Sequence, residues 1–505
     1  MQHLIEKSIV EEAKKRLARY SQRSYYAVKY QKSYTKRTGE KAKSRTTGLP
    51  KSWEFDPHFD PRHCINHSKF IAKGVWNSLL NGTYSPKTAL RSEHTKPDGG
   101  VRYIDAFSIP DAAIANIFMR ILRKRNAKSF SDCSYAYQEG KTPLDAVLRV
   151  KRMLKGEKIF ISQYDFSKFF DNIEHDHINY MLREDGPFQT TFMERQLLQS
   201  VLKHKYSLNG KITQRDLGTP QGNSLSLFTS NVAAHFLDEE LSKLSGLFVR
   251  FADDSVVVNY SYEEALKCAE TYRQFSESSG VKINSTKSSG IRLLANTESE
   301  IRHINEFSFL SYKFTPDELL VSDKTIKTIK MRCAKTIYRH LLLHPRRANM
   351  VSAKRISGKQ YDWDLVTCLN ELRNYIYGGL RQTQIDDYLN GKANIRNMQG
   401  AVSYFSLVEN SAQFRSLDGW LVDILHRAVS ERVRFIRNVT TKKTHRLIDV
   451  DELLNGSWYQ VTSAPMSRME TTVPSFFTAW RAGRKSLTRH GLGGVDTIGM
   501  GYNYE

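Results

Sequence analysis

The most constraining feature of this sequence is a pair of adjacent aspartates between two apolar runs. Phe251-Ala252-Asp253-Asp254 follows Leu247-Phe248-Val249-Arg250 and precedes Val256-Val257-Val258. Short β-branched and aromatic runs on both sides of a turn predict the two strands of a hairpin. Two crowded carboxylates repel each other unless a cation compensates them. Because hard oxygen ligands favour Mg²⁺ or Mn²⁺, the pair indicates metal-assisted phosphoryl chemistry, with an ordinary polar hairpin turn as the alternative.

A third carboxylate lies upstream of this hairpin. Residues 158–165 alternate as a strand does and end on Asp165, and residues 166–173 predict a turn into a helix. An aspartate at a strand end beside an acidic hairpin can share two metal ions with it, about 3.5–4 Å apart. Two such ions activate an attacking oxygen and stabilise a leaving pyrophosphate. A helix N-cap is the alternative role for Asp165.

A glycine-rich loop lies between these two elements in the chain. Gly218-Thr219-Pro220-Gln221-Gly222 carries little side-chain bulk, so a flat ligand could approach its backbone. The residues after the loop predict a helix with small residues on one face. Taken alone, the loop favours an ordinary glycine-rich connection.

In this order, Asp165, the segment Gly218–Asn231 and the Phe251–Asp254 hairpin resemble motifs A, B and C of reverse transcriptases. Four flanking segments resemble further blocks of the group II intron-like lineage. These are two fingers blocks, motif D and the primer-grip motif E, at residues 95–111, 134–143, 281–287 and 309–312. The seven blocks together resemble most the defence-associated (abortive-infection or "unknown group") bacterial enzymes.

Three positions depart from the family pattern. Phe251 stands where tyrosine is commoner, Leu227 where most relatives have proline, and Ser311 where motif E usually has glycine. None of these changes removes a catalytic group. The resemblance therefore implies a divergent but active enzyme.

The resemblance also assigns roles to single residues. It implies that Asp165 and Asp253 bind two Mg²⁺ ions, or Mn²⁺, that Asp254 completes the site, and that the carbonyl of Phe166 is a further metal ligand. Contacts with the incoming dNTP are implied for Lys96, Arg102, Phe170, Gln221 and Lys287. Within that set the two fingers cations hold the triphosphate, the glutamine touches the nascent base pair, and Lys287 protonates pyrophosphate or is simply a surface lysine. The primer grip is implied for Phe309, Leu310, Ser311 and Tyr312.

Phe170 matches the gate residue below the sugar of the incoming nucleotide. A bulky apolar ring at that position would clash with a ribose 2′-hydroxyl and leave it without a hydrogen-bond partner. Sites that leave a polar group unpaired discriminate strongly. The residue therefore favours dNTPs over NTPs and disfavours an RNA-making polymerase.

Charge and composition favour a nucleic-acid partner. The net charge is +23, the pI is near 9.6, and aromatic residues make up 11% of the chain. A cationic surplus of this size favours polyanions, and the interleaved aromatics are typical of single-strand binding surfaces. We see neither an apolar run of about 18 residues nor a secretion signal, so we expect a bacterial cytoplasmic protein without a membrane partner. The five scattered cysteines indicate neither disulfides nor a zinc site.

The sequence predicts an α+β right hand with fingers, a palm containing an antiparallel sheet, and a helical thumb. Residues 1–60 form a basic, tyrosine-rich extension and linker, which we interpret as RNA-binding, with a solvated basic tail as the alternative. The fingers span 61–145, the palm with motifs A to E 146–315, and the thumb 316–440. A basic amphipathic helix over 324–343 begins the thumb. Residues 441–505 form a C-terminal extension with a flexible tail.

Two tyrosines in that glycine-rich tail suggest a further hypothesis. Some defence-associated relatives begin synthesis from a protein hydroxyl. By that resemblance, Tyr502 or Tyr504 primes DNA synthesis, with a tail that has no such role as the alternative.

The expected activity is RNA-directed DNA synthesis from dNTPs on a structured non-coding RNA template in antiphage defence. No integrase, RNase H or nuclease pattern accompanies the seven blocks, which favours that role by elimination. Retron, diversity-generating and intron-type enzymes remain alternatives, as does a non-catalytic RNA-binding scaffold. The sequence leaves open whether the chain forms a homo-oligomer.

Overall fold

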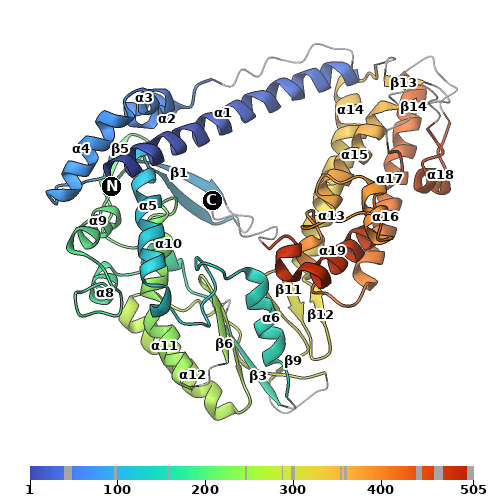
Figure 1. Ribbon diagram of the computed structural model, residues 1–505. Helices are drawn as coiled ribbons and strands as arrows, with labels where there is room; N and C mark the ends of the chain where they lie inside the picture. The colour runs from blue at the N-terminus through green and yellow to red at the C-terminus, as the bar shows by residue number, and fades with distance from the viewer. Residues whose placement is uncertain are drawn as a thin grey trace. The chain divides into compact units, whose positions relative to one another are not determined.

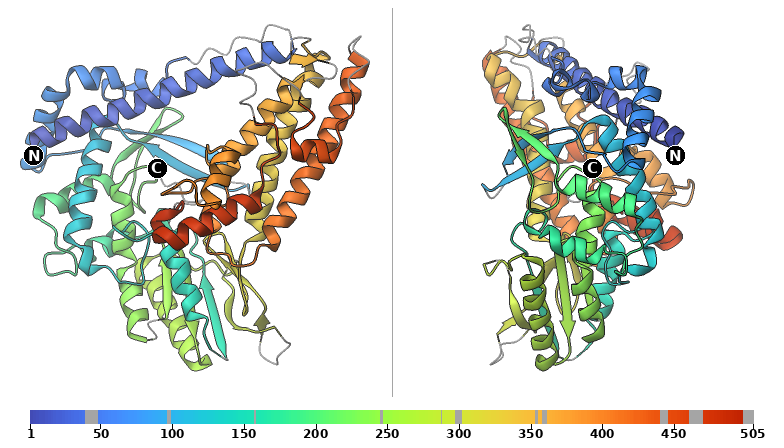
Figure 2. Two further views of the ribbon diagram at one scale, coloured as in Figure 1. Left: turned by 45° about the vertical axis from the view of Figure 1, so that its right-hand side comes forward. Right: turned by 90° about the vertical axis from the view of Figure 1, so that its left-hand side faces the viewer.

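A computed structural model of the 505-residue chain describes residues 1–38, 48–95, 99–156, 158–244, 247–286, 288–296, 302–352, 355–357, 361–439, 446–459 and 470–497. The chain divides into two compact units. Unit 1 comprises residues 1–24 and 47–305, and unit 2 comprises residues 25–46 and 306–504. Helix α1 (Gln2–Thr38) is one unbroken helix, drawn in dark blue, and contributes to both units (Figures 1 and 2).

Unit 1 contains a five-stranded sheet in the order β6-β7-β3-β8-β9. Its strands are β3 (Ile159–Tyr164), β6 (Phe248–Phe251), β7 (Asp254–Asn259), β8 (Gly290–Leu294) and β9 (His303–Ile304). All neighbours pair antiparallel except β8 and β9. Helix α12 (Tyr262–Ser279) lies against β3, β7 and β8, and α6 (Pro143–Met153) lies against β6. Nearly every residue of β3 is buried, so the strand does not show the half-exposed alternation that its sequence predicts.

A second sheet in unit 1 has the order β2-β1-β4-β5. The hairpin of β1 (Ala89–Thr95) and β2 (Val101–Ala106) is joined by β4 (Lys205–Leu208) and β5 (Lys211–Gln214). Strand β4 pairs parallel with β1, with Leu90 opposite Ser207. A hairpin from the middle of the predicted palm therefore completes the sheet of the predicted fingers.

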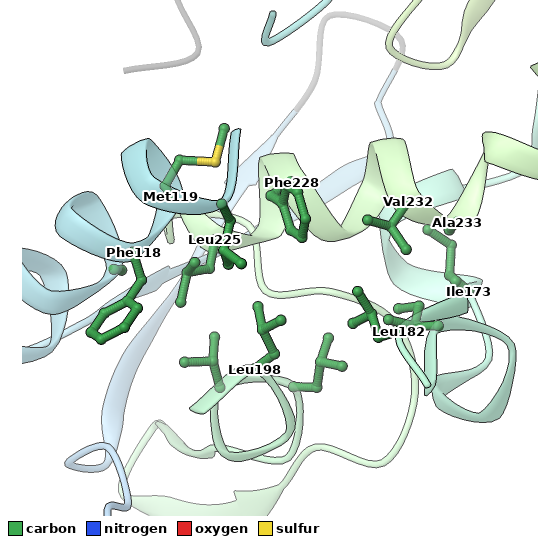
Figure 3. Packing of buried hydrophobic residues seen from close by; sticks show 14 of the residues in the cluster. Phe118, Met119, Ile173, Leu182, Leu198, Leu225, Phe228, Val232 and Ala233 are labelled. Carbon is green, nitrogen blue, oxygen red and sulfur yellow. The ribbon is translucent and has the colours of Figure 1, made fainter. Parts of the chain in front are cut away.

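The helices of unit 1 surround one apolar core. Besides α6, α12 and the first part of α1 they are α2 (Lys51–Phe55), α3 (Pro61–Asn66), α4 (Ser68–Leu80), α5 (Ile109–Arg125), α7 (Phe169–Asn172), α8 (His175–Met181), α9 (Phe192–Leu202), α10 (Leu225–Ala233) and α11 (His235–Leu244). Figure 3 shows Leu225 and Phe228 of α10 on the side of Phe118 and Leu198, and Val232 of the same helix on the side of Ile173 and Leu182; all belong to one cluster. Helix α10 is buried on nearly all sides, which fixes the loop that precedes it.

Unit 2 begins with a three-stranded antiparallel sheet of β10 (Phe307–Phe309), β11 (Tyr312–Phe314) and β12 (Leu319–Val321). Its helices are α13 (Asp323–Tyr338), α14 (His344–Ala348), α15 (Trp363–Tyr377), α16 (Gln382–Leu389), α17 (Ala412–Val439), α18 (Val450–Asn455) and α19 (Phe476–His490), and β13 (Ile356–Ser357) pairs with β14 (Tyr361–Asp362). Helices α13, α15 and α17 pack on one another, and α19 packs on α15, α16 and α17.

These features confirm the predicted α+β class with its antiparallel sheet and helical second half. The predicted helix over 324–343 corresponds to α13 and the helical turn Arg339–Leu343 that follows it. The boundaries proposed between fingers, palm, thumb and extensions stay predictions. Within the described ranges, none of the helices combines the length and the apolar character that crossing a membrane requires.

A buried ion-pair cluster holds the helices of unit 2 together. The Arg432 side chain on α17 is fully buried and binds Asp362 through Nε (2.6 Å) and Asp364 through Nη2 (2.8 Å). Arg432 also donates to the carbonyl of Leu341 at 2.9 Å. Buried charges such as these persist only when they are paired and hydrogen-bonded.

We predict that Arg432→Met lowers the free energy of unfolding of the protein by about 3–5 kcal/mol, because it leaves buried carboxylates without their partner. Arg427→Met, on the same helix, removes an exposed ion pair with Asp423 and should cost less than about 1 kcal/mol. Urea unfolding followed by far-UV circular dichroism measures both variants. Equal stability of the two variants would contradict the structural role of the cluster.

Candidate active site

The acidic hairpin has the geometry that its sequence predicts. Strands β6 and β7 pair with Phe251 opposite Asp254, so that Ala252 and Asp253 form a two-residue turn. Ala252 has a φ of +58°, which is uncommon for a residue with a Cβ. Such a backbone conformation costs about 1–3 kcal/mol and persists only where the surroundings impose it. The turn is therefore held in place by its neighbours.

The main restraint is Arg250, whose side chain is fully buried. Its guanidinium binds the Asp238 carboxylate twice, at 2.7 and 2.5 Å, and donates to the carbonyl of Ala252 at 2.8 Å. It also donates to Asn231 of α10 and to Ser134. Burial alone would lower the pKa of Arg250, but the Asp238 carboxylate outweighs this effect and the pKa is raised. The side chain of Arg250 thus connects the acidic turn to α10, to α11 and to Ser134, which lies in the segment between α5 and α6.

Asp165 follows the last residue of β3, and that residue, Tyr164, lies opposite Ser255 on β7. The backbone of Asp165 is fixed by the segment predicted to be motif D and by the residue that follows it. Its carbonyl accepts from the N–H of Asn284 (2.8 Å), and its N–H donates to Ser288 Oγ (3.1 Å). The adjacent strand ends therefore bring Asp165 and the acidic hairpin to the same edge of the sheet.

The electrostatics of Asp253 show that the two carboxylates interact. Burial raises the pKa of Asp253, and the negative charge of Asp165 raises it further, whereas the positive charges of Arg102 and Arg250 act in the opposite direction. Arg250 is already paired with Asp238. The excess negative charge between Asp165 and Asp253 is thus compensated only in part, which suits a divalent cation.

Asp165 and Asp253 are the two carboxylates that the structure brings close together, and their oxygen atoms are of the kind that a hard divalent cation prefers. Over the part of the chain that the structure describes, no three or more His, Cys, Asp or Glu side chains form a group that could hold a metal ion. Asp254 lies at the start of β7 beside the turn. The Phe166 ring packs in the core against Phe169, Tyr272 and Phe275, which holds the backbone next to Asp165.

The glycine-rich loop is clamped between two backbones. A Cβ on Gly218 would lie 2.4 Å from the carbonyl oxygen of Asp171, and a Cβ on Gly222 would lie 2.4 Å from that of Asp105. The N–H of Thr219 donates to the carbonyl of Phe170 at 2.6 Å. The lack of a Cβ at these two glycines therefore lets neighbouring protein backbone approach the loop closely.

A second buried cluster ties this loop to strand β2. The Asp105 carboxylate accepts two hydrogen bonds from Arg91 (2.7 and 2.8 Å) and one from His204 (3.2 Å). The backbone N–H of Asp105 donates to the carbonyl of Gln221 (2.7 Å). Burial would raise the pKa of Asp105, but the hydrogen bonds from Arg91 and His204 lower it well below its usual range. Asp105 therefore links β2, which carries the predicted dNTP contact Arg102, to the loop that carries the predicted contact Gln221.

The structure brings together most of the described candidate residues of unit 1. Phe170 lies on α7, its ring edge-on to Phe169, and Gln221 donates to Asp171 Oδ2 at 3.4 Å. Arg102 is exposed on β2 and is close enough to affect Asp253. Lys96, Lys287, Tyr502 and Tyr504 lie outside the described residues. Their roles stay predictions, as do those of the residues that the structure describes.

The predicted primer grip belongs to unit 2. Phe309 and Tyr312 face each other across the β10–β11 hairpin, and Leu310 and Ser311 form its turn with φ values of +48° and +70°. The left-handed backbone at Ser311 explains why glycine is the usual residue at this position. Tyr312 donates to the carbonyl of Tyr404, whose hydroxyl donates back to the carbonyl of Leu310 at 3.2 Å.

Sequence reasoning missed Arg250, Asp238 and Asp105. Arg250 offered a signal, because a charged residue inside the apolar run before the aspartates must be paired if it is buried. The positions of its partners offered none, since they come from distant parts of the chain.

We predict that Gly218→Ala and Gly222→Ala each lower the free energy of unfolding by about 2–4 kcal/mol, because the added Cβ meets backbone atoms and the φ is positive. Gly74→Ala, on α4 with no atom within 4 Å of the new Cβ, should instead raise it by about 0.5–1 kcal/mol. Thermal unfolding by calorimetry measures all three variants. The clamp would be refuted if either loop variant were as stable as the unsubstituted protein.

The stretch that contains the candidate site is similar to known proteins. Residues 94–314 match the family model described as reverse transcriptase (RNA-dependent DNA polymerase). The chain is similar to a putative COX1/OXI3 intron 1 protein of Saccharomyces cerevisiae, with 25% identity over 173 residues, covering 34% of this chain and 20% of the yeast protein. An uncharacterized 91 kDa protein in a cob intron of Schizosaccharomyces pombe is 26% identical over 153 residues, covering 30% of this chain and 18% of that protein. The chain thus spans about a fifth of the length of these curated relatives.

Two solved structures are also similar to the chain. Apo telomerase from Candida tropicalis, truncated from the C-terminal domain, gives a TM-score of 0.36 at 14% identity, covering 52% of this chain and 60% of that one. Telomerase from Candida albicans in complex with a TWJ fragment of telomeric RNA gives 0.39 at 11% identity, covering 76% and 69%. Scores this low carry no argument about the fold. The match to the reverse transcriptase (RNA-dependent DNA polymerase) model covers less than half of the chain, and that stretch includes Asp165, Gln221 and both aspartates of the hairpin.

Proposed function

We propose that this chain synthesises DNA from dNTPs on an RNA template. The observation that carries the proposal is that Asp165, directly after β3, lies close enough to the turn before β7 for its charge to act on Asp253, inside the stretch that matches the reverse transcriptase family. Two incompletely compensated carboxylates held by a rigid sheet are what phosphoryl transfer with divalent metal requires of a protein.

In this proposal Asp165 and Asp253 hold Mg²⁺, or Mn²⁺, with Asp254 and the carbonyl of Phe166 as further oxygen donors. The bound metal would supply Lewis-acid stabilisation of the charge on the transferring phosphoryl group. Arg102 on β2 places a fixed positive charge near Asp253 and would hold the triphosphate there. The rigid attachment of β2 to the Gln221 loop through Asp105 keeps the triphosphate and base contacts in register.

The nucleotide class follows from Phe170. Its carbonyl accepts from both the N–H and the Oγ of Thr219, at 2.6 and 3.3 Å, and its ring packs against the core. Because the backbone of Phe170 is held and its half-buried ring contacts the core, moving this residue aside for a 2′-hydroxyl would cost packing. We therefore assign dNTPs rather than NTPs as the substrates.

For the biological role we propose a bacterial antiphage enzyme that works in the cytoplasm with its own structured non-coding RNA. The net charge of +23 supports a polyanionic partner. The printed names of the two curated relatives, both from introns, favour the intron-type alternative instead. Sequencing of the RNA and DNA that co-purify with the protein separates these roles: one dominant non-coding RNA supports the first, and a self-excised intron supports the second.

We predict that Asp253→Asn lowers the rate of dNTP incorporation on an oligo(dT)-primed poly(rA) template with Mg²⁺ by at least about 10²-fold, because it removes a charged metal ligand. Its stability without metal should not fall, since the substitution also removes the repulsion from Asp165. Asp387→Asn, in the acidic doublet on α16, is the matched control and should leave the rate unchanged. Unchanged incorporation by Asp253→Asn would favour the non-catalytic scaffold.

We also predict that Phe170→Ala reduces the preference for dTTP over UTP by about 10²-fold on the same template, because the cavity accepts the 2′-hydroxyl. Phe170→Tyr keeps the ring and should keep the preference. The ratio of kcat/KM values for the two nucleotides measures the effect. A preference that survives Phe170→Ala would remove this residue from sugar discrimination.

A further inference from the structure

Within unit 2, residues 25–37 of helix α1 present two different faces. Tyr30, Tyr34 and Arg37 face inward. The rings of Tyr30 and Tyr34 lie 5.3 and 5.2 Å from that of His344, and Arg37 Nε lies 3.4 Å from Asp364 Oδ1. Arg37 also contacts the His340 ring. These residues attach the end of α1 to α14, α15 and the turn between α13 and α14.

The opposite face carries Tyr25, Lys29, Lys32 and Lys36, which repeat at the spacing that places residues in one line along a helix. All four are exposed, and Tyr25 and its neighbour Tyr26 are 61% and 55% accessible. The two tyrosine rings lie edge to face at 5.7 Å, with Lys29 Nζ 6.0 Å from the Tyr25 ring. The structure thus distinguishes the exposed rings of Tyr25 and Tyr26 from those of Tyr30 and Tyr34, which pack against His344.

This outward line has no internal charge compensation. Residues 13–38 include no Asp or Glu. Among the residues that the structure describes, none forms an ion pair with Lys29, Lys32 or Lys36. Like charges at spacings of three and four residues repel each other on a helix. The three aligned lysines are complementary to a polyanion. The two exposed tyrosine rings beside them are complementary to flat groups that can stack.

We propose that the line of Tyr25, Lys29, Lys32 and Lys36, together with the exposed ring of Tyr26 beside it, binds single-stranded RNA; we call these five residues the Tyr–Lys line. Phosphates would lie along the three lysines, and bases would stack on the two tyrosines. The alternative polyanion, an anionic membrane surface, requires an apolar helix face rich in Trp, Phe or Leu, and the outward face offers only Val28. The inference deepens the proposed function, because it names where the associated RNA is held.

The test is fluorescence anisotropy of a fluorescein-labelled oligouridine of about 20 nucleotides with the full chain, in EDTA and without dNTPs. Under these conditions RNA binding is measured independently of catalysis, so an inactive polymerase can still pass. Lys29→Gln, Lys32→Gln and Lys36→Gln together should weaken binding at least tenfold at about 150 mM salt. The slope of log affinity against log salt should become shallower by about 2.

Tyr25→Ala with Tyr26→Ala should also weaken binding about tenfold but leave the salt slope unchanged, since stacking releases no counterions. Two control variants match these changes elsewhere. Arg152→Gln, Lys155→Gln and Lys158→Gln remove the same charge from unit 1, and Tyr180→Ala removes a tyrosine that is 60% exposed on α8. Neither control should alter affinity by more than about twofold. Because all the substituted lysines of α1 are exposed, thermal unfolding should match the unsubstituted protein.

The proposal is overturned if the α1 lysine variant keeps the affinity and salt slope of the unsubstituted protein, or if the matched unit 1 charge variant loses as much. It is also overturned if the α1 lysines are needed for binding vesicles of phosphatidylserine and phosphatidylcholine but not for binding RNA.

Discussion

A single buried cation sets the position of the acidic turn. Arg250 contributes its backbone to β6 and its guanidinium to Asp238, Asn231, Ser134 and the carbonyl of Ala252. Removing any charged member would leave another buried charge without a partner, which is costly in a low-dielectric interior. The strained φ of Ala252 can persist because this network over-determines it. The position of Asp253, one of the two candidate metal-binding carboxylates, therefore depends on the buried side chain of Arg250.

A second constraint acts on the glycine-rich loop that precedes α10. Both glycines of the Gly218–Gly222 segment are pressed against carbonyl groups, one from α7 and one from β2. Contacts between backbones leave little room for adjustment, because neither partner has a rotamer to change. The candidate sugar gate at Phe170, the Gln221 loop and the strand that carries Arg102 are consequently held as one rigid set.

Much of this was predictable from local pattern. The apolar runs around Asp253 and Asp254 predicted the hairpin, and the pattern before Asp165 predicted a strand; both are present, although the strand ends at Tyr164, one residue before Asp165, and is buried on both faces. Resemblance supplied the remaining candidate roles. Neither source could predict that β4 pairs with β1, that His204 and Arg91 share Asp105, or that Tyr30 and Tyr34 pack against His344 while Tyr25 stays exposed. Each of these depends on contacts between residues far apart in sequence, and local propensity and periodicity carry no information about such contacts.

The parallel pairing of β1 with β4 has a consequence for how the chain is made. While the protein is still on the ribosome, β1 and β2 can form a hairpin on their own, but the neighbour that completes their sheet is synthesised only after β3 and helices α5 to α9. Until β4 is made, the edge of β1 that will pair with it stays unpaired, and such non-local pairing is slow and exposed to aggregation. Nascent chains of this protein should therefore depend on chaperones until residue 214 has emerged.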